Sequence, residues 1–325
     1  MPKNIAAIDI GTNSTRLLIA SLSGSRINTL VREMIITRLG KNISSDNIIL
    51  KESMAKTVNA LSSYLKLCRQ HKVEKIRVVG TSVLRRASNS SHFVEYVSEK
   101  TGLEVEVISG TEEARLAFEG VVKSLANTEK TFGQIRNGFT EGKKEKEKII
   151  VLDIGGGSIE IVSGRSDCSI SGIKSIELGS VTISEKYLKE DRPGTAEIAL
   201  MSDIIKKILQ NDLGKSEPYK NAFLIGVAGT VSSLGSIFLG MEKYERDKLN
   251  GLILSEKDIK GIFRMLSGLS SEERRKIKGL QPERADIIIG GTAILLAFLR
   301  YFKADKLMLS EHDILDGIIY SLCNF

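Results

Sequence analysis

Short apolar runs separated by polar turns dominate the first residues of the chain and predict β-strands. In segment 5–21 the runs AAIDI and LLIA are joined by the polar segment GTNSTR, which is typical of a β-hairpin. A polar, glycine-containing stretch follows to about Leu50. Apolar residues then recur at helical spacing, so a helix is predicted over 54–71.

The rest of the first half alternates between strand and helix patterns. Strands are predicted at KIRVVGTS and LEVEVIS, and helices over 91–101 and 112–125. This succession is complete near residue 126. The stretch 127–148 then loses periodicity and ends in EGKKEKEK, which is typical of a solvated connector or surface insertion. We therefore predict a domain boundary there.

The second half repeats this logic and predicts a second α/β domain. Its expected elements are a hairpin at 149–163, a strand and helix near 174–188, a helix over 196–209, a strand at AFLIGVAG, mainly helical material, and a last helix over 310–320. The domain prediction is a first lobe at 1–126, a connector or insertion at 127–148, a second lobe at 149–308, and a C-terminal helix at about 309–325 that packs back on the first lobe.

The two hairpins carry the same unusual turn. In each, an aspartate near the end of an apolar run is followed, after one isoleucine, by a turn rich in Gly, Ser or Asn. Superimposing the hairpins at Asp9 and Asp153 pairs Gly11 with Gly155, Ser14 with Ser158, and Arg16 with Glu160. A duplicated hairpin predicts an α/β fold of two similar lobes with an interdomain cleft, in which two phosphate-binding turns act on one ligand.

These turns have the composition of an anion site. Glycine permits a tight reversal, and successive N–H groups in such a turn form a concavity that binds anions. We expect Asn13, Ser14 and Ser158 to add donors, and Arg16 to hold a phosphate. The expected ligands of Mg²⁺ are carboxylates, here Asp9, Asp153 and Glu160. Ordinary hairpin turns are the alternative, but the repetition favours phosphate binding.

Glu113 is the candidate catalytic base. Glu112 shares a helix face with Arg115, whereas Glu113 shares a face with Leu116 and is expected to point inward. An inward carboxylate near phosphate can orient or deprotonate an attacking water. A helix-start glutamate favoured by the macrodipole is the alternative, and on these residues alone it explains Glu113 equally well.

Two further loops follow predicted strands. One contains Gly229 and Thr230 and opens a helix, whose first N–H groups can take a phosphate. The other contains Thr81, Ser82 and Arg85. Each pattern alone is weak, because Gly-Thr connections are common in α/β domains and arginines near helix starts are more often surface residues.

Composition narrows the class of protein. The chain has 325 residues, 42% hydrophobic and 27% charged, which is enough for two cores. Its net charge of +7 suits a polyanionic ligand, although a well-solvated surface explains it as well. Three scattered cysteines suggest neither a disulfide framework nor a zinc site. No leader is apparent, and the longest apolar stretch, 287–299, is too short to span a bilayer, so a cytoplasmic protein with no membrane or nucleic-acid partner is expected.

The motifs, taken in order, resemble those of the exopolyphosphatase and guanosine pentaphosphate phosphohydrolase (Ppx/GppA) family over about residues 5–320. They are DIGTNSTRL, VVGTSVLRRASN, VISGTEEARLAFEGV, DIGGGSIEIV, SIELGSVTISEKYL, GVAGTVSSL and LQPERADIIIGGTAIL. The resemblance implies two RNase H-like lobes of the actin, sugar-kinase and heat-shock ATPase superfamily. It also implies Mg²⁺-dependent release of orthophosphate from inorganic polyphosphate, with pppGpp as a further candidate substrate, and a possible homodimer.

The resemblance also implies residue roles. Glu113 matches the catalytic base, Asp153 and Glu160 match a magnesium-associated pair, and the loops are expected to hold phosphate. The expected holders outside the first hairpin are Thr81, Ser82, Arg85, Gly155, Gly156, Gly157, Ser158, Gly229 and Thr230. Rival functions are a kinase or ATPase of the same superfamily and a non-catalytic scaffold that binds phosphate or nucleotide.

This chain departs from the family pattern in three places. The connector 127–148 is long, and SEHDILDGII lacks the usual Leu-Arg-Glu, so an acidic Asp replaces a basic position. The chain also stops where longer members continue into a helical domain, so a polyphosphate-binding canyon built by that domain is expected to be absent. These departures concern distal substrate contacts more than the catalytic centre.

Overall fold

The computed structural model describes residues 3–23, 26–43, 47–126, 148–214 and 222–322. The chain divides into two compact units, of which the first comprises 1–144 and 312–325 and the second comprises 145–311. The predicted boundaries at 126 and 149 flank residues 127–147, so the predicted connector lies outside the described residues except for Lys148.

The first unit is built on a five-stranded sheet with the order β3-β2-β1-β4-β5. The strands are β1 (Asn4–Ile10), β2 (Thr15–Ser23), β3 (Arg26–Ile35), β4 (Lys75–Gly80) and β5 (Val105–Val107). The first three strands form an antiparallel meander, and β4 and β5 run parallel to β1. The α/β class predicted from the alternating pattern is confirmed.

Helices cover both faces of this sheet. Successive side chains of a strand point to opposite faces, so Ile8 and Ile10 pack into one core with α2 (Lys51–Gln70) and α4 (Ser90–Thr101). Ala7 and its neighbours pack into the other core, with α5 (Gly110–Ala126) and α14 (Ile314–Ser321). The short helix α3 (Ser82–Arg86) follows β4. Because both faces are covered, β1 is buried along nearly its whole length.

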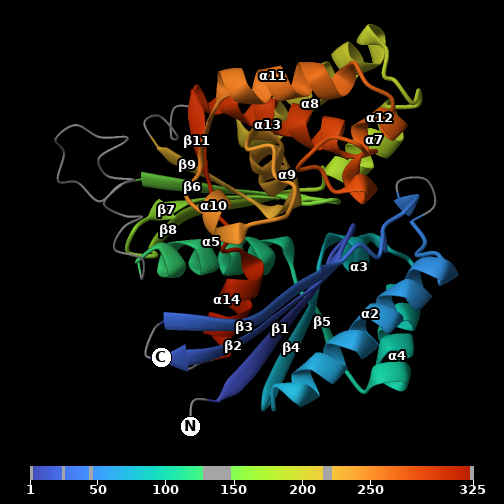
Figure 1. Ribbon diagram of the computed structural model, residues 1–325, viewed down its shortest axis with the longest axis vertical. Coiled ribbons are helices and arrows are strands. Elements are labelled where there is room, and N and C mark those ends of the chain that lie inside the picture. Colours follow the sequence, from blue (N-terminus) through green and yellow to red (C-terminus); the bar gives the residue numbers. More distant parts are fainter. Residues whose placement is uncertain (1–2, 24–25, 44–46, 127–147, 215–221, 323–325) are drawn as a thin grey trace. The chain divides into compact units, whose positions relative to one another are not determined.

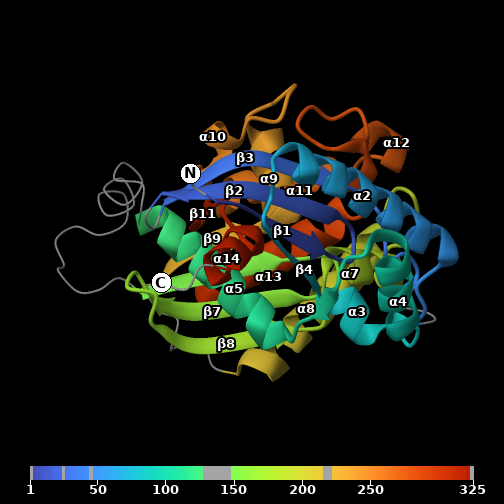
Figure 2. The ribbon, with the colours of Figure 1, turned by 90° about the horizontal axis from the view of Figure 1, so that it is seen from below.

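Helices α5 and α14 lie side by side, although they are far apart in the sequence (Figures 1 and 2). Two glycines allow this close approach. A Cβ at Gly317 would lie 1.9 Å from the Leu116 carbonyl oxygen, and one at Gly120 would lie 2.1 Å from that of Asp313. The main chain of Asp313 is therefore held firmly against α5.

The second unit repeats the same sheet and adds one strand, in the order β10-β11-β9-β6-β7-β8. Its strands are β6 (Lys148–Ile154), β7 (Ile159–Arg165), β8 (Ile170–Ile176), β9 (Phe223–Val227), β10 (Ile253–Ser255) and β11 (Lys306–Leu309). As in the first unit, three antiparallel strands are followed by parallel neighbours, and β10 adds an antiparallel edge. The predicted duplication of the α/β lobe is confirmed.

The helices of the second unit pack around a buried central helix, α13 (Ile288–Phe302), which contacts α7, α8, α9 and α11. The others are α7 (Ser180–Tyr187), α8 (Thr195–Leu213), α9 (Ala228–Phe238), α10 (Arg246–Leu249), α11 (Glu256–Ser267), α12 (Ser271–Arg274) and the 3₁₀ turn Pro282–Arg284. The apolar stretch 287–299 thus forms a core helix. In the described parts of the chain, no helix combines the length and apolar character needed to cross a membrane.

Three strands correct the sequence-based prediction. The polar stretch predicted up to Leu50 contains β3. Because β3 is an edge strand, its residues are mostly exposed or half-buried, and its sequence therefore shows little hydrophobic alternation from which a strand could be predicted. The predicted mainly helical C-terminal part contains β10 and β11, which are too short to give a periodic signal. The last helix begins at Ile314, not at residue 310.

Candidate functional site

The turn Gly11–Ser14 joins β1 to β2 in the first unit. The Gly11 N–H donates to the Ser14 carbonyl (3.0 Å), and the Arg38 N–H donates to the Asn13 carbonyl (2.9 Å). Asn13 is only 8% exposed, and its Nδ2 has no hydrogen-bond partner among the residues that the structure describes. A buried amide donor left unused is costly, so this turn is suited to receive an anion.

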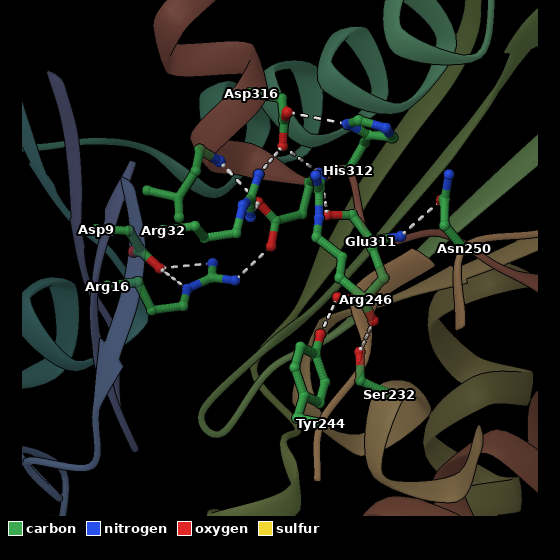
Figure 3. A network of polar contacts seen from close by, with 12 residues as sticks. Asp9, Arg16, Arg32, Ser232, Tyr244, Arg246, Asn250, Glu311, His312 and Asp316 are labelled. Carbon is green, nitrogen blue, oxygen red and sulfur yellow. Dashed lines mark hydrogen bonds and ion pairs between the residues drawn. The ribbon is translucent and has the colours of Figure 1, made fainter. Parts of the chain in front are cut away.

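Asp9 and Arg16 face each other across the β1–β2 register. Arg16 donates from Nε (2.8 Å) and Nη2 (2.6 Å) to Asp9 Oδ2, and from Nη1 to Asp313 Oδ2 (2.5 Å; Figure 3). Asp9 Oδ1 is buried with no hydrogen-bond partner in the described residues. Burial raises the pKa of Asp9, and the charge of Arg16 opposes that rise. One oxygen of this carboxylate is thus fixed and the other remains unused.

The loop after β4 lies beside this turn, because β1 and β4 are parallel neighbours and end at the same sheet edge. The Thr81 N–H donates to the Ile10 carbonyl (3.2 Å). A Cβ at Gly11 would lie 3.9 Å from both Thr81 Oγ1 and Asp9 Oδ2. Thr81 and Ser82 are both buried. The structure therefore brings the first turn, Asp9 and the Thr81 loop together.

Glu113 pairs directly with Arg85. Arg85 Nη1 donates to Glu113 Oε2 (2.6 Å) and to the Ile108 carbonyl (3.2 Å), and the two side chains are 17% and 11% exposed. The Ile108 N–H in turn donates to the Gly80 carbonyl at the end of β4 (3.1 Å). Glu112 instead pairs with Arg115 on the outer face of the helix. Glu113 is buried, as the helix-face argument predicts.

In the second unit, the turn Gly155–Ser158 is closed by the Gly155 N–H donating to the Ser158 carbonyl (3.0 Å). The Gly155 carbonyl accepts from the Ser180 N–H at the start of α7 (2.9 Å). A Cβ at Gly179 would lie 2.3 Å from the carbonyl carbon and oxygen of Gly156. The turn, with Gly156 and Gly157 at its centre, therefore rests on the start of α7, and only glycine at 179 allows it.

Asp153 and Glu160 face each other across β6 and β7, in the same register as Asp9 and Arg16 in the first unit. Both are buried, and Ser175 Oγ donates to Glu160 Oε1 (2.8 Å). Like charges directly opposite each other destabilise a sheet, and a cation relieves that cost. Two carboxylates completed by substrate oxygens and water are a usual magnesium arrangement. These residues therefore fit the cation that the sequence predicts.

No group of three or more His, Cys, Asp or Glu side chains able to hold a metal occurs in the described ranges. Asp153 and Glu160 form a pair within the second unit, and Asp9 belongs to the first unit. The unpartnered Asp9 Oδ1 and the Asp153–Glu160 pair are the features that suit a hard cation.

The loop at Gly229 and Thr230 follows β9, and Val227 is paired with Asp153 across the β6–β9 register. Ala228 adopts a φ of +69°, a strained conformation for a residue with a side chain. Thr230 is buried. Such strain at the junction of strand and helix is typical of functional loops.

Arg284 is a residue at this loop that the sequence reasoning missed. A Cβ at Gly229 would lie 2.1 Å from Arg284 Nη1, so the guanidinium lies over this glycine. Arg284 is 7% exposed, and its Nε donates to Gln281 Oε1 (2.8 Å). The signal available in the sequence was an arginine in LQPERADIII, just before an apolar helix.

Glu311 is a second buried residue that the sequence reasoning did not select. Ser232 Oγ (2.6 Å) and the Tyr244 hydroxyl donate to its carboxylate (Figure 3). Arg246 Nη2 donates to the Glu311 carbonyl (2.9 Å), and the Glu311 N–H donates to Asn250 Oδ1 (3.1 Å). These contacts fix the end of the second unit, just before the chain enters the first unit at His312.

Each unit thus gathers its polar loops at the carboxyl-terminal edge of the parallel strands, where open α/β sheets bind phosphorylated ligands. The duplicated sheets and these loops define a two-domain protein of the actin-like ATPase fold. The model of the Ppx/GppA phosphatase family matches residues 18–133 and 134–324. The chain belongs to this family.

Curated relatives agree with this membership. The chain is 32% identical to exopolyphosphatase 2 of Mycobacterium tuberculosis over 98% of both chains. It is 32% identical over 97% of its length to a bifunctional 3-dehydroquinate synthase/phosphatase of Fusobacterium nucleatum, and spans 46% of that protein. It is 28% identical over 98% of its length to guanosine-5′-triphosphate,3′-diphosphate pyrophosphatase of Photobacterium profundum, and spans 59% of that protein.

Solved structures agree as well. The Ppx-GppA enzyme of Aquifex aeolicus is 29% identical, covers 99% of this chain and 100% of its own, and superimposes with a TM-score of 0.78. The similarity spans both units of the chain.

Proposed function

We propose that this protein is an exopolyphosphatase that hydrolyses the terminal phosphoanhydride of inorganic polyphosphate and releases orthophosphate. The 5′-triphosphate end of pppGpp, converted to ppGpp, is the alternative substrate, because it presents the same bond. The observation that carries the proposal is the buried pair of Glu113 and Arg85. It lies next to the end of β4, which also carries the Thr81 loop.

The reaction requires a base that is held in position. In the proposed step, a water oxygen bonds to the terminal phosphorus while the bridging P–O bond breaks, and Glu113 accepts the proton from that water. Arg85 fixes the Glu113 carboxylate through Oε2. The shortened polyphosphate leaves with the bridging oxygen.

Phosphate binding is assigned to the loops at the sheet edges. Asn13 contributes its unused buried amide, and Ser14, Thr81 and Ser82 contribute hydroxyls in the first unit. In the second unit we assign phosphate binding to the turn of Gly155, Gly156, Gly157 and Ser158, to the loop of Gly229 and Thr230, and to Arg284 beside that loop. These groups neutralise and orient phosphoryl oxygens, which is the main source of rate enhancement in phosphoryl transfer.

Asp153 and Glu160 of the second unit are the pair that would hold a magnesium ion, which when bound would supply charge neutralisation at the phosphoryl oxygens. Asp9 of the first unit, through Oδ1, is a further candidate cation ligand. Phosphate binding by Arg16 stays a prediction, because its Nε, Nη1 and Nη2 already donate to Asp9 and Asp313. A cytoplasmic location and a homodimer stay predictions too, to be tested by cell fractionation and light scattering.

The deciding experiment measures phosphate release by purified protein from long-chain polyphosphate, short-chain polyphosphate, pppGpp and ATP, with and without Mg²⁺. Glu113→Gln is the test variant, and Glu112→Gln is the matched control at the neighbouring position. We expect release from polyphosphate that is lost only in Glu113→Gln. Phosphorylation of an acceptor by ATP would indicate a kinase instead, and binding without release would indicate a scaffold.

A further inference from the structure

Asp313 is a charged residue to which neither the family resemblance nor the proposed reaction gives a role. It caps the start of α14, where its Oδ1 accepts from the Leu315 N–H (3.0 Å). Its other oxygen, Oδ2, accepts from Arg16 Nη1 (2.5 Å). It is 6% exposed, and its main chain packs against Gly120. The carboxylate therefore has little freedom to move.

Asp313 is itself held by a second arginine. Arg32 Nη1 lies 3.5 Å from Asp313 Oδ1, and Arg32 Nη2 pairs with Asp316 Oδ2 (Figure 3). His312 Nδ1 lies 3.0 Å from Asp316 Oδ1. Burial alone would raise the pKa of Asp313, but Arg16 and Arg32 hold it below its ordinary value. Asp313 is thus the charged partner between the two arginines.

Arg16 transmits this arrangement to Asp9. Two of its N–H groups hold Asp9 Oδ2, and Nη1 is held by Asp313. The plane of a guanidinium is rigid, so fixing Nη1 fixes the direction of the other donors. Asp9 then keeps one oxygen bound to Arg16 and presents Oδ1, which has no hydrogen-bond partner in the described residues.

The structure assigns Asp313 the role of a positioning residue that acts through Arg16 and raises the affinity of Asp9 for a divalent cation. The inference rests on the proposed function, because it concerns the cation assigned to that reaction. Two effects support it. The negative charge of Asp313 offsets part of the positive charge of Arg16, so Arg16 weakens the attraction of Asp9 for a cation less than it would alone. It also fixes Arg16 so that Asp9 Oδ1 stays available.

The test substitutes Asp313→Asn, which preserves side-chain volume and remains a good helix cap. Calorimetric titration of the full chain with Mg²⁺, without substrate, measures the Kd. We expect the Kd to rise roughly 10-fold, the lower end of the effect of losing a partner behind a metal ligand. Hydrolysis should then need more Mg²⁺, with kcat recovered at saturating Mg²⁺ and the KM for polyphosphate unchanged.

Asp258→Asn is the matched control. Asp258 is the third residue of α11 in the second unit and completes the capping box of Ser255, whose N–H donates to Asp258 Oδ2 (3.0 Å), so its substitution perturbs a helix start without touching Asp9. The Asp258→Asn variant should bind Mg²⁺ with the same Kd as the wild type. Asp313→Ser, another good cap without charge, replaces Asp313→Asn if the latter fails to fold.

Several outcomes would overturn the inference. A Kd for Mg²⁺ within about twofold of the wild type in whichever Asp313 variant folds rules out the positioning role. An Asp313→Asn protein with unchanged Mg²⁺ Kd and a lower KM for polyphosphate would make Arg16 a phosphate ligand restrained by Asp313. Neither result affects the proposed hydrolase, which is tested separately by phosphate release from Glu113→Gln. A wild-type chain that binds no Mg²⁺ overturns the inference too.

Discussion

Replacing Gly179 by alanine tests how the Gly155–Ser158 turn is held. A Cβ at this position would lie 2.3 Å from the carbonyl carbon and oxygen of Gly156 and 2.4 Å from the Gly157 nitrogen. All three are backbone atoms, so no side-chain rotation relieves the clash. The φ of Gly179 is −138°, which alanine adopts without strain. The effect of the substitution is therefore steric.

The size of the effect follows from the displacement required. Ordinary contact begins near 3.4 Å, so the turn or the start of α7 must move by about 1 Å. Overpacking of this kind costs about 1–3 kcal/mol of unfolding free energy. Displacing a substrate-binding group by about 1 Å lowers activity roughly 100-fold. We therefore expect Gly179→Ala to lose far more activity than its stability loss explains.

Urea unfolding and steady-state phosphate release from polyphosphate measure the two effects. Gly261→Ala is the matched control, because a Cβ there would meet no atom of the described residues within 4 Å beyond its chain neighbours and its own helix backbone, and the residue is exposed on α11. That control should gain about 0.5–1 kcal/mol from the helix propensity of alanine and keep full activity. Gly179→Ala with kcat/KM within about twofold of the wild type would refute the reasoning that this turn binds substrate in a fixed position.

Three further predictions concern the base, the cation and a buried thiol. Glu113→Gln should lower kcat about 10²–10⁴-fold with little change in KM, whereas Glu112→Gln should match the wild type in the same steady-state assay. Chelation of divalent cations with EDTA should abolish phosphate release, and added Mg²⁺ should restore it; full activity in EDTA would exclude the cation. Burial raises the pKa of Cys68 from 9.0 to about 11. The folded state therefore keeps the thiol proton up to a higher pH than the unfolded chain does. The free energy of unfolding consequently falls between those two pH values, by about 1.4 kcal/mol per pH unit. Cys68→Ala should remove this part of the slope in urea unfolding at pH 8 and 10, and an unchanged slope would contradict the assignment.

The hairpins were predictable from sequence because their defining contacts are local. Asp9 and Arg16 are seven positions apart and face each other across adjacent strands, and Asp153 and Glu160 do the same. A strand period of two and a glycine-rich turn are enough to indicate that geometry. The inward direction of Glu113 was equally local, because it depends only on helix periodicity.

Long-range partners were not predictable in this way. The Arg16–Asp313 contact joins residues 297 positions apart, and nothing in either motif indicates it. The contact depends on α14 returning to the first unit and packing on α5 through Gly120 and Gly317. The same holds for Arg284, which reaches Gly229 only once the second unit is folded. Strands β10 and β11 were missed because three or four residues form a strand only beside a neighbour.

One register position gives the two duplicated hairpins opposite charge. Opposite Asp9 stands Arg16, which neutralises the pair and leaves one carboxylate oxygen without a hydrogen-bond partner among the described residues. Opposite Asp153 stands Glu160, so the second hairpin buries two carboxylates on one face. Buried like charges are costly unless a cation or a proton compensates them. The same backbone therefore gives the second hairpin the stronger attraction for a cation, while in the first hairpin the arginine limits that attraction and orients its aspartate. The difference in charge between the two hairpins thus comes from a side chain, Arg16 against Glu160, and not from a difference in strand pairing.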